Sequence, residues 1–376
     1  MNLNITLSPI NNCLKIGLFF LIIKVMLGFS TYNTIIPKLD STLSLIAIIF
    51  LVLHIFQKTF TIKLFFIYAF IMLLSCISSY LVGNTTLFIT VITVLAIHDE
   101  KDIISFLMKY EFLIVLIIIS IFVTTYNIRL YNEVNKVYGF YYVFSHPNVF
   151  SCIVFNIIIM WIWCNYERLT TKNMIFVGLL FIGFYLITKT KTILLVGLCS
   201  TVLITIALKG NKQISKLLSY ITGGIIPLLS IVFYWLISNY NNTNRVILAI
   251  DKFLTGRIRL GAYAYYHYGS TLFGQYIEKN DIFGWDSYWQ MSKFTTFDNM
   301  YTMFIVRYGI IWLVLLSVIF YLLAKKNNNR INCMLIIWSV YAITEAHIIN
   351  GYLGFPVLLS ALLLEKKQAE IQEIKL

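Results

Sequence analysis

The chain has 376 residues, of which 59% are hydrophobic and 12% charged, and its mean hydropathy is +0.82. Because globular domains are about one quarter charged, this composition excludes a soluble globular protein. The formal net charge of +13 is better explained by lysines that flank membrane helices than by binding to nucleic acid. The composition therefore predicts an all-α fold, a polytopic bundle of membrane helices.

The apolar runs are the elements that the sequence shows most clearly, and a helix needs about 20 residues to cross a membrane. We expect about twelve spans within a single integral membrane domain of residues 1–376. They are expected at 14–31, 41–57, 62–81, 84–98, 104–126, 147–164, 173–188, 191–208, 217–238, 300–323, 331–347 and 351–364.

Positive charge predicts the orientation of these spans. The connectors that are rich in lysine and arginine, and the C-terminal tail, all fall on one side of the membrane. That side is expected to be cytoplasmic, as are both termini. The six cysteines form no CxxC pair, so neither a metal site nor a disulfide framework is predicted.

Two sizeable loops are expected on the outer face, at residues 127–146 and 239–299. The longer loop contains the stretch LAIDKFLTGRIRLGAYAYYHYGSTLFGQ, which predicts a helix broken at Gly256 or Gly261. Helical spacing places Arg259, Tyr263 and Tyr266 on one stripe, with His267 beside it. Tyrosine-rich helices favour the membrane interface, so we expect this loop to lie at the membrane surface as interfacial helices.

Polar and charged groups are concentrated on the same outer face. Arginine binds phosphate through two parallel hydrogen bonds and lysine adds a point charge, so these cations indicate an anionic ligand. Histidine or a carboxylate among them could accept the proton of a hydroxyl group. The candidates are Arg129, His146, Asn148, Lys189, Lys191, Arg257, Arg259, Asp298, Asn299, Glu345 and His347.

Structural roles are open for the same residues. His146 could cap the helix that Pro147 begins, with Asn148 contributing to the same helix start. Asp298 and Asn299 could likewise form a helix N-cap.

The cations have structural alternatives too. Arg257 and Arg259 could be solvated loop charges, and Lys189 and Lys191 could anchor two helices at the interface. Arg307 lies roughly two turns inside its expected span, where it either faces a cavity or extends its charge toward the interface.

Four motifs in this order resemble the bacterial Wzy-type polysaccharide polymerases, within the wider group that includes the O-antigen ligases. They are SHPN at a helix start, TKTKT between two spans, LTGRIRLGAYAYYHYGSTLFGQ in the long outer loop and FDNMYTMFIVRYGII at the next helix start. The resemblance covers roughly residues 129–312.

The resemblance implies an enzyme of the bacterial cytoplasmic membrane that polymerises oligosaccharide repeat units carried on undecaprenyl pyrophosphate at the outer leaflet. It implies membrane lipid as a partner and, as further candidates, a flippase and a chain-length regulator of the same pathway, with no nucleic acid, metal or cofactor. The implied catalytic residues are His146, Arg257 and Asp298. The substrate-binding candidates, taken from the resemblance and from the charge and helical spacing of the residues, are Arg129, Asn148, Lys189, Lys191, Arg259, Tyr266, His267, Asn299 and Arg307.

Two other functions remain open. A glycan ligase would use the same lipid-linked donor with a different acceptor. A flippase for the same unit would need charges along a central passage and pseudo-symmetric halves. The clustering of polar groups on one face favours an enzyme, and the general base is open between His146, Asp298 and no protein group.

Overall fold

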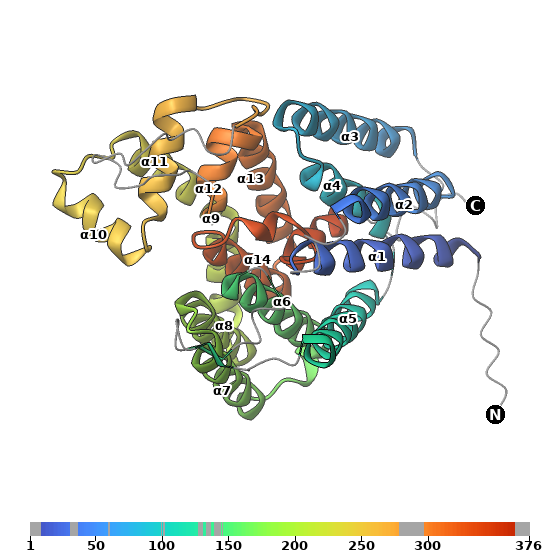
Figure 1. Cartoon of the computed structure of the whole chain (residues 1–376), viewed down its shortest axis with the longest axis horizontal. Helices are drawn as coiled ribbons and strands as arrows, with labels where there is room; N and C mark the ends of the chain where they lie inside the picture. The colour runs from blue at the N-terminus through green and yellow to red at the C-terminus, as the bar shows by residue number, and fades with distance from the viewer. Residues whose placement is uncertain are drawn as a thin grey trace. The chain divides into compact units, whose positions relative to one another are not determined.

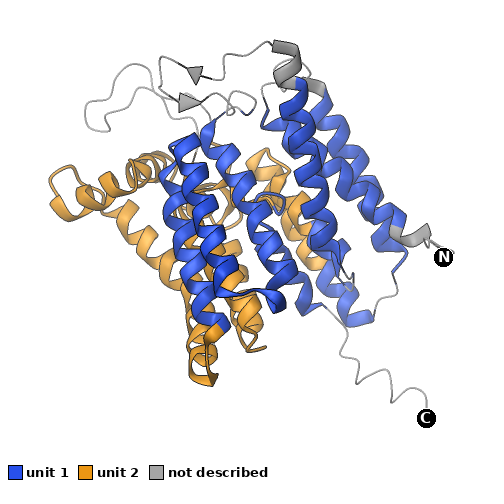
Figure 2. Cartoon of the chain, turned by 90° about the horizontal axis from the view of Figure 1, so that it is seen from below, with its two compact units in different colours: residues 1–68, 92–208, 351–376 blue, residues 69–91, 209–350 orange. Residues whose placement is uncertain are grey.

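The computed structural model divides into two compact units, which Figure 2 colours blue and orange. Unit 1 comprises residues 1–68, 92–208 and 351–376, and unit 2 comprises residues 69–91 and 209–350. The residues that the structure describes are 9–30, 37–58, 61–98, 100, 102–126, 131–132, 137–138, 144, 146–277 and 297–364.

Unit 1 is built from helices that pack in chain order, α1 on α2 and α5, α5 on α6, and α6 on α7 (Figure 1). A close helix contact lies between α7 and α8, where a side chain at Gly197 would overlap the ring of Phe181. The elements are α1 (Pro9–Gly28), α2 (Pro37–Phe56), α5 (Ile103–Tyr126), β1 (Tyr131–Asn132), β2 (Val137–Tyr138), α6 (Pro147–Asn165), η3 (Tyr166–Arg168), α7 (Thr171–Thr188), α8 (Lys191–Lys209) and η6 (Phe355–Leu363).

Unit 2 is organised around α9, against which α11, α12, α13 and α14 pack. Two further helices, α3 and α4, run from one unit into the other. The elements are α3 (Ile62–Val82), α4 (Thr86–Ile97), α9 (Lys212–Ser238), α10 (Arg245–Phe253), α11 (Arg257–Tyr268), α12 (Met300–Met303), η4 (Phe304–Tyr308), α13 (Ile310–Ala324), α14 (Asn329–Tyr341) and η5 (His347–Ile349).

Seven helices among the described residues are long and apolar enough to cross a membrane, which agrees with an integral membrane protein. The expected number of about twelve is not confirmed. The seven stretches are Leu39–Phe56, Ile62–Val82, Ile103–Ile121, Pro147–Arg168, Thr171–Thr188, Lys191–Lys209 and Lys212–Ser238.

The last three expected spans differ from continuous helices. The expected span 300–323 is interrupted at Gly309, and in the expected span 331–347 the helix ends at Tyr341. The expected span 351–364 is instead a 3-10 helix, η6, preceded by turns at residues 351–353. Hydropathy averaged over a membrane-length window does not detect these interruptions, because apolar residues predominate on both sides of each of them.

The interruption at Gly309 is filled by the backbone of residues 271–277. Gly309 has φ +108°, and a Cβ atom there would overlap the carbonyl oxygen of Leu272. The amide N–H of Gln275 donates to the carbonyl of Arg307 (2.8 Å), and its side-chain Nε2 donates to the carbonyl of Val306 (2.7 Å). Non-helical backbone is tolerated inside a membrane protein only where its polar groups have partners, and this segment supplies them.

Replacing Gly309 with alanine is expected to destabilise unit 2 by more than about 2 kcal/mol, because the new methyl group meets backbone and the left-handed conformation disfavours it. Gly224→Ala is the matched control, since nothing lies within 4 Å of a Cβ atom at that helical position. Thermal unfolding in detergent measures both. Equal midpoints for the two variants would contradict the close packing at Gly309.

Candidate functional site

The predicted helix break lies at Gly256, in the turn between α10 and α11. Thr255 and Gly256 both have left-handed backbone conformations, with φ of +57° and +86°. The buried carboxylate of Asp251 accepts the backbone N–H of Arg259 at 2.9 Å, which caps the first turn of α11. The alternative position, Gly261, lies inside α11, where a Cβ atom would be 2.9 Å from the side chain of Thr302. The turn therefore fixes where Arg257 and Arg259 begin the helix.

The guanidinium group of Arg257 is buried, with 8% of the residue exposed, and it binds the end of α14. Its Nε donates to the carbonyl of Thr344 at 3.0 Å. Its Nη1 donates to the carbonyl of Leu254 at 3.1 Å and to the hydroxyl of Thr255. Thr344 lies in the turn after α14, so Arg257 satisfies a carbonyl group there that the helix does not.

The start of α12 binds the same turn. Asn299 Nδ2 donates to the carbonyl of Ile343 at 2.7 Å, and the N–H of Met300 donates to the carbonyl of Ala342 at 3.0 Å. Asn299 Oδ1 also accepts the N–H of Thr302 at 2.9 Å, so the predicted N-cap is confirmed for Asn299. Three successive carbonyls, at residues 342–344, are thus bound by side chains or backbone from the starts of α11 and α12.

A carboxyl group completes this junction. Glu345 Oε1 lies 3.9 Å from Arg257 Nη2, and Glu345 is 3% exposed. Burial raises the pKa of the Glu345 carboxyl to about 8, while Arg257 lowers it and Asp298 raises it. Arg257, Asp298 and Glu345, which we call the junction cluster, therefore come from three separate stretches of unit 2 and interact electrostatically. The cluster contains a carboxyl group that can gain or lose a proton near neutral pH.

The second arginine of α11 has a different environment. Arg259 is half-buried, and its Nη2 lies close to Gly256, 3.3 Å from where a Cβ atom would stand. On the same helix, Tyr266 is 74% exposed, and the ring of His267 lies 4.3 Å from that of Tyr263, which is buried. The stripe predicted from helical spacing thus runs from the buried Tyr263 to the exposed Tyr266.

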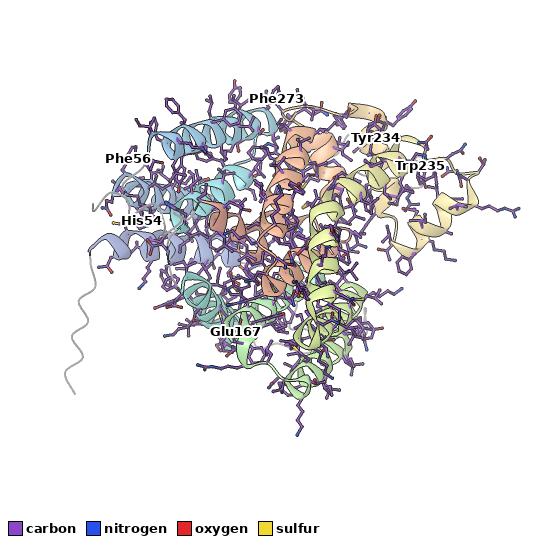
Figure 3. All side chains as sticks on the ribbon, turned by 180° about the vertical axis from the view of Figure 1, so that it is seen from behind. His54, Phe56, Glu167, Tyr234, Trp235 and Phe273 are labelled. Carbon is purple, nitrogen blue, oxygen red and sulfur yellow. The ribbon has the colours of Figure 1, made fainter. Side chains whose placement is uncertain are left out.

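Aromatic side chains at the C-terminal end of α9 lie next to α11. Tyr234 and Trp235, both labelled in Figure 3, are exposed, and the hydroxyl of Tyr234 lies 3.2 Å from that of Tyr265. Tyrosine and tryptophan are suited both to membrane interfaces and to sugar rings, because each has an apolar body and a polar edge.

The other motif residues belong to unit 1. His146 caps α6, its Nδ1 accepting the N–H of Asn148 at 3.1 Å, so the predicted capping role is confirmed. Asn148 itself is half-buried near the start of α6. Lys189 ends α7 with φ +54° and Lys191 begins α8, and both side chains are exposed.

Two candidate arginines remain. Arg307 lies in η4 beside the interruption at Gly309, with its Cζ 5.8 Å from the centre of the Tyr308 ring. Its Nε is buried and has no hydrogen-bond partner in the part of the chain that the structure describes. Arg129, in the first outer loop, lies outside the described residues.

The structure thus brings Arg257, Asp298 and Asn299 together in unit 2. It adds Asp251 at the cap of α11, to which the sequence analysis assigns no role, and it gives Glu345, one of the outer polar candidates, a specific partner in Arg257. The position of Glu345 in the apolar stretch after residue 331 was the available signal, because carboxylates in such stretches usually have a specific partner.

No family model, curated protein or solved structure matches this chain.

The stability of the protein is expected to fall as the pH rises from about 4.5 to about 8, because of Glu345. Its pKa is 4.5 as an ordinary carboxyl and about 8 in the fold, so the folded state holds the proton more tightly than the unfolded state. That contribution is complete below about 4.5 and is lost as the pH passes through about 8. Thermal unfolding between pH 5 and 9 measures it.

Glu345→Gln should remove this part of the pH dependence. Glu167→Gln is the control, because Glu167 is exposed in η3. Identical pH profiles for wild type and Glu345→Gln would show that Glu345 is not the group responsible.

Proposed function

We propose that the chain polymerises oligosaccharide repeat units carried on undecaprenyl pyrophosphate, at the outer leaflet of a bacterial cytoplasmic membrane. The observation that carries the proposal is the junction cluster, in which Arg257, Asp298 and Glu345 interact at helix ends, while the helix that Arg257 begins carries the exposed Tyr266 further along. Ionisable groups buried in membrane proteins are costly, and they are kept mainly where they act on a ligand or on one another. The order of the four sequence motifs supports the same function.

The two arginines of α11 take different parts in this proposal. Arg257 already donates to two carbonyls and a hydroxyl and lies against Glu345, so it acts as a positioning residue. Arg259, two residues later and half-buried, contacts the lipid pyrophosphate. A guanidinium group there stabilises the negative charge that develops on the leaving phosphate.

The reaction transfers the growing glycan between two lipid carriers. The bond between the anomeric carbon of the donor glycan and its pyrophosphate oxygen breaks, and that carbon bonds to a hydroxyl oxygen of the acceptor unit. The electron pair of the broken bond leaves with undecaprenyl pyrophosphate, and the hydroxyl proton passes to a base or to water. His146, Asp298 and no protein base remain the alternatives for that proton.

The aromatic surface suits both parts of such a substrate. Tyr266 of α11 and Tyr234 and Trp235 of α9 are exposed, and such rings can stack on sugars or lie at the membrane interface. A glycan ligase would use the same donor site, so the acceptor distinguishes the two enzymes.

Arg259→Ala is expected to lower polymer formation by at least about 100-fold, the loss typical when a donor to a developing oxyanion is removed. The protein should still reach the membrane in normal amount, because Arg257 and Asp251 continue to hold the start of α11. The measurement is the size distribution of lipid-linked and surface glycans in cells that carry each variant as their sole copy.

Lys252→Ala is the matched control, since Lys252 is an exposed cation on α10 and should leave the size distribution unchanged. Accumulation of single repeat units in the Arg259→Ala cells supports a polymerase. Long chains stranded on the lipid would instead indicate a ligase, and units held on the cytoplasmic leaflet would indicate a flippase. Full-length glycan at wild-type level would remove Arg259 from the site.

A further inference from the structure

A carboxyl group that the proposed reaction does not use lies inside unit 1. Glu111 is in α5, within the membrane-length stretch Ile103–Ile121, and its exposed fraction is 0%. Its Oε2 accepts a hydrogen bond from Asn156 Nδ2 of α6 at 3.1 Å. Its Oε1 is buried and has no hydrogen-bond partner in the part of the chain that the structure describes. A carboxyl in this position is a functional candidate, because membrane helices rarely keep one without use.

Asn156 connects this carboxyl to the non-helical backbone that precedes η6. Its Nδ2 also donates to the carbonyl of Tyr352 at 3.0 Å, and its Oδ1 accepts the N–H of Phe355 at 2.9 Å. The hydroxyl of Tyr352 lies 3.3 Å from that of Thr93 in α4. Glu111 is therefore joined through one amide to the segment 351–354, which lies among α4, α5 and α6.

No cation neutralises Glu111 within the described residues. The charged side chains on its own helix and on the neighbouring α1 are Lys109, Lys15 and Lys24, and none of them pairs with it. Lys24 pairs with Asp40 at 3.7 Å, and Lys109 is exposed and lies over the Tyr110 ring. α4 and α6 carry no Lys, Arg, Asp or Glu, and the titratable group nearest in the non-helical segment is the Tyr352 hydroxyl.

Two small cations can occupy such a carboxyl, a proton or a sodium ion. A sodium ion needs several oxygen ligands around it, as hard cations do. The other oxygens joined to this site already accept hydrogen bonds, the Tyr352 carbonyl from Asn156 and the Asn156 Oδ1 from Phe355. A proton needs only the carboxyl itself, and it removes the large cost of an unpaired charge in a dry interior. The contacts favour a proton.

We propose that Glu111 is an intramembrane proton-binding site of unit 1, which holds its proton in the folded protein and controls the segment 351–354 through Asn156. In the protonated form the carboxyl is neutral and the segment stays packed among the helices. Loss of the proton places a negative charge against the carbonyl of Tyr352, which favours release of the segment. This inference does not depend on the glycan reaction, because it concerns contacts within unit 1 only.

Infrared spectroscopy of the purified full-length protein tests the proposal, since protonated and ionised carboxyls absorb at different frequencies. The experiment uses the Glu345→Gln background, because burial also raises the pKa of Glu345, to about 8. At pH 8 this protein should retain one protonated-carboxyl band. Adding Glu111→Gln should abolish that band, whereas adding Glu167→Gln, an exposed control, should leave it unchanged.

Asn156→Ala should move the disappearance of the band to higher pH, because the lost amide N–H stabilises the ionised form. No band at pH 8 in the Glu345→Gln protein would overturn the proposal, even if Glu111→Gln failed to fold. A band that Glu111→Gln left in place would also overturn it. The proposal would also be overturned if replacing potassium chloride with sodium chloride at constant pH abolished the band. Sodium would then displace the proton and occupy the site.

Discussion

The turn that follows α14 is the constraint on which the candidate site depends. Its carbonyl groups lie beyond the helix, where no helix N–H reaches them, and in a largely apolar chain few other donors are available. Here Arg257, Asn299 and the N–H of Met300 each bind one of three successive carbonyls after Tyr341. This arrangement fixes the starts of α11 and α12 against one turn, and it places Glu345 beside Arg257.

The same constraint explains how each unit accommodates backbone that is not helical. In unit 2, the side chain of Gln275 donates to a carbonyl next to the interruption at Gly309. In unit 1, the side chain of Asn156 both donates to and accepts from the segment before η6. A neutral amide can do both without the cost of burying a charge. Few buried positions in the two units therefore hold charged groups, and the charged groups at these positions are candidates for binding or catalysis.

The two glutamates of interest differ in their surroundings. Glu345 has a guanidinium group 3.9 Å away, whereas Glu111, among the described residues, has an amide donor and no cation. A nearby cation favours the ionised form of a carboxyl, and a dry interior without one favours the neutral form. The first arrangement suits a group that exchanges protons beside an anionic substrate, and the second suits a group that holds its proton.

The sequence by itself determined that this is an all-α protein with membrane-length helices, because hydropathy and length are properties of the local chain. It also located the helix starts at Pro147 and Met300 and limited the helix break to Gly256 or Gly261, since proline, asparagine and glycine have local backbone preferences. Only the tertiary structure decided that Gly309 interrupts a helix, that Arg257 binds the end of α14 and that Glu111 meets Asn156. These contacts join residues from about 35 to 90 positions apart, such as Arg257 with Thr344, and no local pattern encodes which buried carbonyl or carboxylate a given donor will satisfy.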